Sequence, residues 1–216
     1  DFAKMKYKNI IWDWNGTIVD DAYLFVDIMN RTLQKHNLSL INLTKYRSSF
    51  CFPIQKYWKK LGFVFDKNSF NALNEQFIFD YSQRMFEPSL QQDIVGLFKK
   101  IKKNRLKQFV LSASEQNLLN KSLEYYSLSK YFDSIVGVNN LNALGKEKMG
   151  LDLILKNNLA KKETLIIGDT EYDLNVSKAI GCDCLLFSAG HFSKDRLKKL
   201  NVAVVDSVDE MSLFIF

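Results

Sequence analysis

Short apolar runs that end in polar turn residues alternate with helical patterns along the second half of the chain. The apolar runs cover residues 108–111, 134–138, 164–167, 183–187 and 202–205. The helical patterns, with apolar residues at spacings of three and four, cover residues 93–103, 115–126 and 149–157. Strands that alternate with helices at this spacing pair in parallel through right-handed crossovers. The pattern predicts an α/β fold with a Rossmann-like parallel sheet and helices on both faces.

The first half of the chain breaks this alternation. Residues 8–14 are predicted to form a first strand, but residues 22–87 show helical periodicity where a second strand would be due. Ser69 is the predicted cap of a helix that runs to about Met85. This segment is predicted to be an insert of helices.

The insert is rich in aromatic residues, which a small helical bundle needs to build a core of its own. We expect most of them to be packing residues and one or two to line a substrate pocket. The predicted bounds are residues 21–86 for the helical insert, and residues 1–20 and 87–216 for the core that contains the sheet.

The composition indicates a chain that folds around a large apolar core without staples and does not span a membrane. With 216 residues, 47% of them hydrophobic, the chain can bury a large core without metal or disulfide staples. Three cysteines give no disulfide framework, so we expect reduced, buried thiols at Cys182 and Cys184 and a cytoplasmic protein. No apolar run approaches the roughly 20 residues of a membrane span, so no membrane partner is expected.

The net charge of +6 could indicate an anionic partner. The lysines, however, lie in dispersed clusters, such as Lys99, Lys100, Lys102 and Lys103 on one predicted helix. A solvated helix face accounts for such a cluster, and we expect no nucleic-acid partner.

Candidate chemistry begins in residues 10–20, I-I-W-D-W-N-G-T-I-V-D, where Asp13 ends an apolar run just before a turn. An open α/β fold builds its site from groups delivered to the carboxyl edge of the sheet, so Asp13 is a candidate reactive group. Taken alone, these residues are equally explained by a strand followed by an Asn-Gly turn.

Other polar residues occupy comparable places, each just after a strand or at the start of a helix: Ser112, Lys146, Asp169 and Asp173. In a parallel sheet the carboxyl ends of all strands lie at one edge, so these residues can converge on Asp13. Each also has an ordinary explanation. Ser112 suits a turn or cap, Lys146 a solvated surface, and Asp173 the first turn of a helix.

Together these residues suit phosphoryl transfer. A carboxylate nucleophile such as Asp13 needs its own charge and that of the phosphoryl oxygens neutralised, and Mg²⁺ held with Asp169 can do this. Lys146 adds a compact positive charge. Ser112 and the backbone N–H of the following turn, at Ala113, can donate hydrogen bonds to a phosphate.

The motif order resembles the haloacid dehalogenase superfamily, and most closely its phosphoglycolate-phosphatase-like branch with a C1 cap. The matching motifs are D-W-N-G-T from Asp13, then Ser112, then Lys146, then G-D-T-x-x-D around Asp169. A response-regulator receiver also uses Asp, Ser or Thr, and Lys, but its phosphorylated Asp follows a later strand, so the motif order excludes it.

This resemblance implies a Mg²⁺-dependent phosphoric monoester hydrolase in which Asp13 forms an aspartyl-phosphate that water then hydrolyses. It also implies a metal site made of the Asp13 carboxylate, the backbone carbonyl of Asn15 and Asp169, with Asp173 as a supporting residue. The helical insert would then be a cap that closes over the site and selects the substrate. The expected partner is a small phosphorylated metabolite, and the protein is expected to be a monomer or a homodimer.

Asn15 departs from the family pattern, which places an aspartate at that position to protonate the leaving group. General acid–base help is worth about 10²–10⁴-fold, so turnover of alkyl phosphates should be slow. The enzyme could act on substrates whose leaving group needs little protonation, or it could use another acid. His191 is a candidate for that acid, although a capping or surface role is favoured for it.

Two alternatives to an ordinary phosphatase stay open. The chain could be a catalytically weak module that binds phosphate compounds, or a phosphonatase that uses Lys45 or Lys56 of the insert as a Schiff base. These lysines and Arg47 flank Pro53, and they could hold an anionic substrate if that loop faces the site, although surface charge is the favoured explanation.

Overall fold

The protein is built on a six-stranded parallel sheet with strand order β3-β2-β1-β4-β5-β6. Its computed structural model describes residues 5–138 and 145–216. The strands are β1 (Asn9–Trp12), β2 (Lys107–Glu115), β3 (Ser134–Val138), β4 (Thr164–Gly168), β5 (Asp183–Phe187) and β6 (Ala203–Val205). Strand β1 lies between β2 and β4, so the two strands that border it end on either side of the motif that follows β1.

Helices occupy most of the remaining described chain. They are α1 (Ala22–Lys35), α2 (Leu43–Ser49), α3 (Ile54–Lys60), α4 (Lys67–Arg84), α5 (Ile94–Lys103), α6 (Gln116–Tyr125), α7 (Lys146–Lys156), α8 (Glu171–Ile180), α9 (Lys194–Leu197) and α10 (Val208–Ile215). Three 3₁₀ turns, at Ser129–Tyr131, Lys161–Glu163 and Lys198–Leu200, precede β3, β4 and β6.

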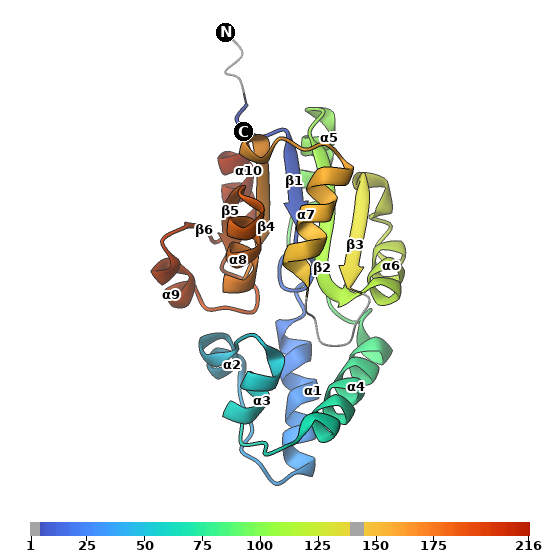
Figure 1. Cartoon of the computed structure of the whole chain (residues 1–216), viewed down its shortest axis with the longest axis vertical. Coiled ribbons are helices and arrows are strands. Elements are labelled where there is room, and N and C mark those ends of the chain that lie inside the picture. The colour runs from blue at the N-terminus through green and yellow to red at the C-terminus, as the bar shows by residue number, and fades with distance from the viewer. Residues whose placement is uncertain (1–4, 139–144) are drawn as a thin grey trace.

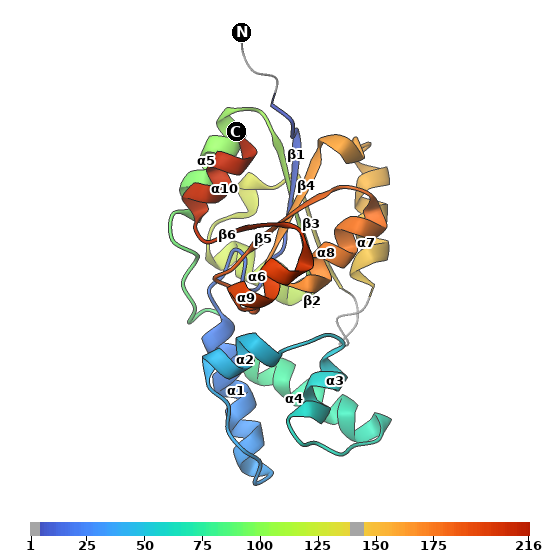
Figure 2. The same cartoon turned by 90° about the vertical axis from the view of Figure 1, so that its left-hand side faces the viewer.

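The sheet is covered on both faces, as the alternation of side chains in β1 shows. Ile10 and Trp12 pack in a core with helices α5, α6 and α10, whereas Ile11 packs with α7 and α8 on the opposite face. Figure 2 shows α5 and α10 on one side of the sheet and α7 and α8 on the other. The predicted fold class, a Rossmann-like parallel sheet with helices on both faces, is confirmed.

Helices α1 to α4 gather beyond the carboxyl ends of the strands, away from the two chain termini (Figure 1). Their aromatic side chains, among them Tyr46, Tyr57, Trp58 and Phe77, form a buried cluster. The cluster continues into residues of α8, β5 and α9, so it is not the core of the insert alone that the sequence suggested. Arg47 fastens α2 to the loop after β5, since its guanidinium donates to the carbonyls of Ala189 and Gly190. The carboxyl edge of the sheet therefore faces a helical wall.

Several local predictions differ from the structure. Asp66, not Ser69, caps α4, because the Asp66 carboxylate accepts the backbone N–H of Ser69. Helix α7 begins at Lys146, ahead of the apolar periodicity that starts at Met149. The described cysteines are free, but Cys182 lies before β5 and is only half-buried, unlike Cys184. Among the described residues, no helix combines the length and apolar character needed to cross a membrane.

Candidate active site

Three carboxylates meet where the central strands end. Asp13 follows β1 and Asp169 follows β4, and the Asp13 backbone N–H donates to the Ile167 carbonyl at 2.8 Å. With Asp173, in the first turn of α8, they place one oxygen each within 4.8 Å of one another. The strand ends thus bring together residues separated by about 150 positions, as the parallel sheet requires.

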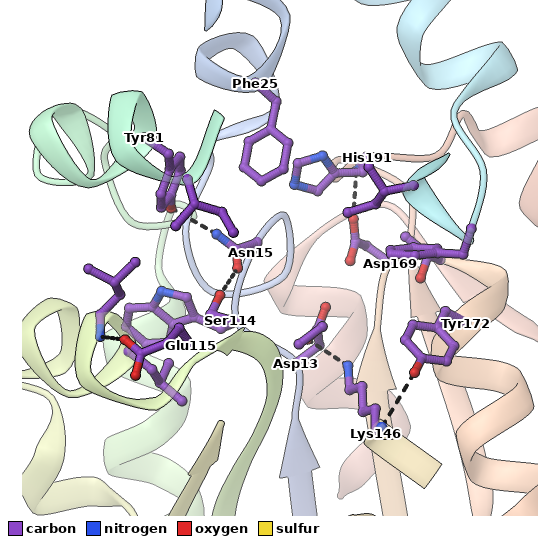
Figure 3. Close-up of a pocket in the computed structure, with 18 of the residues that line it drawn as sticks. Asp13, Asn15, Phe25, Tyr81, Ser114, Glu115, Lys146, Asp169, Tyr172 and His191 are labelled. Carbon is purple, nitrogen blue, oxygen red and sulfur yellow. Dashed lines mark hydrogen bonds and ion pairs between the residues drawn. The ribbon is translucent and has the colours of Figure 1, made fainter. Parts of the chain in front are cut away.

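Lys146 joins this group from the start of α7. Its ammonium lies 2.7 Å from Asp13 Oδ1 and 2.6 Å from Asp173 Oδ1, with only 3% of the side chain exposed. Burial lowers the pKa of Lys146, but the charges of Asp13 and Asp173 outweigh it and leave the pKa above its usual range. A permanently charged lysine is therefore held against Asp13 (Figure 3).

Asp173 fixes the turn that carries Asp169. Its second oxygen, Oδ2, accepts the backbone N–H groups of Asp169 and Thr170 and the hydroxyl of Thr170. This capping box ties the end of β4 to the start of α8. Asp173 therefore positions both Lys146 and Asp169.

The loops around Asp169 approach it closely enough to require glycine. Gly16 has a φ of +76°, and a Cβ there would collide with the carboxylate of Asp169 and the ring of His191. Gly190 approaches the same carboxylate, so a Cβ there would also collide with it. The Asp169 carboxylate accepts hydrogen bonds from the Thr17 hydroxyl at 3.1 Å and from the backbone N–H of His191 at 2.5 Å. Its carboxylate is thus fixed from two loops.

The buried carboxylates favour a bound cation. Burial and the charge of Asp173 raise the pKa of Asp13, Lys146 opposes both, and the net effect is a pKa of about 6. Burial also raises the pKa of Asp169 well above its usual range. One lysine cannot neutralise three carboxylates, and a hard divalent cation such as Mg²⁺ prefers oxygen ligands of this kind. The donor set therefore fits Mg²⁺.

Both ends of the Asn15 side-chain amide, its nitrogen and its oxygen, make hydrogen bonds. Its amide nitrogen donates to Asp21 Oδ2 at 2.5 Å and to the Tyr81 hydroxyl at 2.8 Å, and its amide oxygen accepts the Ser114 hydroxyl at 2.6 Å. Tyr81 in turn donates to Asp21 Oδ2 at 2.8 Å. Figure 3 shows Asn15 between Ser114 and Tyr81. The amide suits a neighbouring carboxylate, since an amide donates to it and an ionised aspartate could not.

His191 lies inside the site and not at a cap or on the surface, which corrects the role that the sequence favoured. It is 4% exposed, with Nε2 at 3.1 Å from Asp21 Oδ1 and Nδ1 at 2.7 Å from the Tyr46 hydroxyl. Burial lowers the pKa of His191, but the hydrogen bond and charge of Asp21 raise it above its usual value. His191 thus connects Asp21 with the backbone that holds Asp169.

Asp21 should be worth a large share of the stability of the fold. Asp21→Ala removes the acceptor used by Asn15, Tyr81, His191 and the Gly16 N–H, all of them buried or half-buried. We expect a loss of about 3–5 kcal/mol in the free energy of unfolding, measured by urea denaturation at pH 7. The matched control Asp20→Ala removes the adjacent, exposed carboxylate and should cost about 0.5 kcal/mol. Equal losses for the two variants would contradict the network.

The residues predicted from the sequence differ in where they lie relative to the cavity. Asp13, Asn15, Ala113, Lys146, Asp169 and Asp173 line one cavity of about 130 Å³. Ser112 is buried beside that cavity, where its hydroxyl accepts the Ser114 N–H at 3.0 Å. Lys45 and Lys56 are exposed and do not line the cavity. The Arg47 guanidinium donates hydrogen bonds to backbone carbonyls instead.

Thr17, Asp21, Tyr81 and Ser114 were not singled out from the sequence, although all four have hydrogen bonds to the candidate residues. The one available signal was the acidic pair I-V-D-D before the first helix, and it is equally typical of a helix start. Their contribution depends on partners that are distant in sequence.

Comparison with known proteins decides the family. The model of the haloacid dehalogenase-like hydrolases matches residues 10–187, which contain all the candidate site residues named from the sequence except His191. The chain belongs to this family. The family predicted from the motif order is therefore confirmed, and the protein is a hydrolase of the haloacid dehalogenase type.

Individual relatives of this hydrolase are distant. A protein of Caldanaerobacter subterraneus assigned as the pyrophosphatase PpaX is 24% identical over 183 residues, which is 82% of this chain and 80% of that protein. A solved structure of a protein assigned as a phosphatase, from Clostridium acetobutylicum, has a TM-score of 0.83 at 22% identity and covers 97% and 98% of the two chains. A structure from Lactobacillus plantarum assigned as a phosphoglycolate phosphatase has a TM-score of 0.83 at 17% identity, covering 98% and 100%. The structural matches establish a shared fold.

Proposed function

We propose that this hydrolase is a Mg²⁺-dependent phosphatase that cleaves a small phosphate monoester through an aspartyl-phosphate on Asp13. The observation that supports it best is the buried contact of 2.7 Å between the Lys146 ammonium and Asp13 Oδ1, beside two further carboxylates. The names of the relatives, a pyrophosphatase and phosphoglycolate phosphatases, agree with phosphate chemistry.

In this proposal each residue has one task. Asp13 attacks phosphorus, and Lys146 lowers the repulsion between that carboxylate and the phosphoryl oxygens. Ser112 and the Ala113 N–H hold the phosphate. Asp173 keeps Lys146 in place by its contact of 2.6 Å. Asp13 and Asp173 thus hold the Lys146 ammonium beside the nucleophile before substrate binds, and its third N–H donor stays available for a phosphoryl oxygen.

The metal would be held by Asp13, Asp169 and the backbone carbonyl of Asn15. When bound there, Mg²⁺ would supply positive charge to the phosphoryl oxygens. Asp169 is prepared for that role because the Thr17 hydroxyl and the His191 N–H fix its orientation before any cation binds. The Asn15 side chain, engaged by Asp21 and Ser114, leaves the metal only its main-chain carbonyl.

Helices α1 to α4, within residues 21–86, would act as the cap. They contribute Phe25, Phe77 and Tyr81 to the wall of the cavity. Figure 3 shows Phe25 and Tyr81 on the side opposite Asp13 and Lys146. Such a wall excludes water during transfer of the phosphoryl group from substrate to Asp13. The partner would be a small phosphorylated metabolite.

Two alternatives are less well supported. A phosphonatase needs a lysine of the helical segment at the site, and Lys45 and Lys56 do not line the cavity. A catalytically weak phosphate-binding module is compatible with Asn15, and it is separated from an enzyme by turnover alone.

Release of inorganic phosphate tests the proposal. With p-nitrophenyl phosphate, whose leaving group needs no acid, we expect steady turnover in Mg²⁺ and a loss of at least about 100-fold after removal of the metal with EDTA, restored when Mg²⁺ is added back. Binding of phosphate without any release in Mg²⁺ would overturn the enzyme and favour the binding module.

A further inference from the structure

The wall of the cavity that lies opposite the three carboxylates consists largely of apolar side chains. Phe25, Phe52, Phe77, Ile54, Ile78 and Leu118 line it, the first five from the helical segment and the last from α6. In Figure 3 the ring of Phe25 extends from α1 into the space above Asn15, between Tyr81 and His191. A substrate whose phosphoryl group lies against Asp13 therefore places its leaving group among these side chains.

A second negative charge finds no basic partner on that wall among the described residues. Within residues 5–138 and 145–216, Lys146 is the one lysine or arginine that lines the cavity, and it already contacts Asp13 and Asp173. Both ring nitrogens of His191 are engaged, one by Asp21 and one by Tyr46. Residues 139–144, N-N-L-N-A-L, contain no basic residue.

The charge that is present on this wall would repel an anion. Glu115 is one of the residues that line the cavity, and its carboxylate caps α6 by accepting the N–H groups of Asn117 and Leu118 at 3.0 Å. A carboxylate or second phosphate on the leaving group would lose its water in an apolar pocket beside Glu115, and burial of an unpaired charge is costly. Phosphoglycolate and pyrophosphate, the substrates in the names of the relatives, both carry such a group.

We propose that the substrate is a phosphate monoester with an uncharged aromatic leaving group, that is, an aryl or arylalkyl phosphate. This inference rests on the proposed phosphatase function and names its substrate class. An aryl leaving group also suits Asn15, because a phenolate departs without a proton from the enzyme. The apolar wall thus favours both kinds of ester, and the amide at position 15 favours the aryl phosphates over the arylalkyl phosphates.

The reaction balances without a further co-reactant. A carboxylate oxygen of Asp13 forms a bond to phosphorus, the ester P–O bond breaks, and its electron pair leaves on the aryl oxygen, which collects a proton from solvent. Water then adds its oxygen to phosphorus, the bond between phosphorus and Asp13 breaks, and the products are the phenol, inorganic phosphate and the free carboxylate.

Binding and turnover together test the proposal. Benzyl phosphate and phosphoglycolate both release an alkoxide, so the ratio of their kcat/KM values reports the pocket with little influence from leaving-group chemistry. We expect benzyl phosphate to be favoured by about 10- to 100-fold. The inhibitors benzylphosphonate and phosphonoacetate should show the same order in Kd by calorimetry. A preference for phosphoglycolate or pyrophosphate would overturn the inference.

A charge placed in the pocket should shift this preference toward phosphoglycolate. Ile78→Arg puts a cation on the cavity wall, and it should favour phosphoglycolate over benzyl phosphate by at least about 10-fold more than the unchanged protein does, measured as the ratio of the two kcat/KM values. Phe79→Arg is the matched control, since Phe79 is the next residue of α4, 59% exposed and off the wall, and it should leave the ratio unchanged. Ile54→Arg offers a second cavity position if Ile78→Arg folds poorly. An unchanged ratio in both folded cavity variants would count against the pocket.

The outcomes also separate this inference from the function on which it rests. If no ester releases phosphate, the proposed phosphatase fails, while the order of the two phosphonates still reports the pocket. If esters are cleaved with phosphoglycolate or pyrophosphate preferred, the phosphatase stands and the aromatic substrate class fails.

Discussion

Asp13→Asn should reduce phosphate release from p-nitrophenyl phosphate by at least about 10³-fold, the largest effect that we expect from any single change. An amide has the shape of the carboxylate but cannot attack phosphorus or hold the phosphoryl group. Lys146 keeps its contact of 2.6 Å with Asp173 in this variant, so its buried charge stays paired and the fold should be retained. The loss should therefore lie in kcat, measured under saturating Mg²⁺ and substrate.

The control for this prediction is Asp20→Asn, which removes a nearby carboxylate that is exposed and does not line the cavity. It should leave kcat unchanged.

Protein quenched with acid during turnover should also carry one phosphoryl group, on the peptide that contains Asp13, and Asp13→Asn should carry none. Retention of more than about a tenth of the activity by Asp13→Asn would assign the nucleophile elsewhere.

The polar residues at the strand ends illustrate what a sequence can reveal. The apolar runs predicted β3 at its observed bounds and β4 to within one residue, because buried parallel strands are apolar on both faces. The strand expected over residues 8–14 contains β1, which is shorter. Once the strands were parallel, their carboxyl ends had to share an edge, and Asp13, Lys146 and Asp169 do line one cavity there. Topology, not local pattern, brought these residues together.

Lys146 shows why the first residue of α7 could not be predicted from the sequence. The apolar period of α7 starts at Met149, yet the helix begins three residues earlier, after Gly145 with a φ of +96°. A lysine is unfavourable at a helix N-terminus because of the helix dipole. Asp13 and Asp173 offset this cost, and both come from other elements. A contact across the fold thus decides a local feature.

His191 is the clearest case of information that the sequence did not contain. Its surroundings come from α1 through Phe25, from α2 through Tyr46 and from the turn before α1 through Asp21. These segments lie some 145 to 170 positions away in the chain. No periodicity around S-A-G-H-F reports that packing, so a surface or capping role was the reasonable interpretation.

Asn15 presents a comparable limit, because its departure from the family pattern was visible but its surroundings were not. The structure shows that the amide donates to Asp21 at 2.5 Å. An aspartate at this position would face a second carboxylate at hydrogen-bond distance, and two such groups must share a proton. The amide at position 15 and the carboxylate at position 21 therefore form a matched pair.

Asn15→Asp should raise kcat for alkyl phosphates such as benzyl phosphate by about 10²-fold, because the introduced carboxyl group can protonate the departing oxygen. Close contact with Asp21 keeps a proton on the pair, which favours the acid form that this step needs. p-Nitrophenyl phosphate should gain little, since its leaving group needs no proton. Asn15→Ala, which removes the amide and adds no acid, should give no gain for either substrate.

The same substitution should cost stability. Asn15→Asp removes the donor to Asp21 Oδ2, and we expect a loss of about 1–3 kcal/mol in the free energy of unfolding by urea denaturation. Adding Asp21→Asn returns a donor to the pair, so the double variant should recover some of that loss, and a double-mutant cycle measures the coupling. If Asn15→Asp leaves alkyl turnover unchanged, another group already supplies the proton, and the slow step lies elsewhere. If turnover rises while stability falls, the chain has an amide where an acid would be faster because Asp21 requires a donor there. Aryl leaving groups, which need no acid, are then the ones that this arrangement favours.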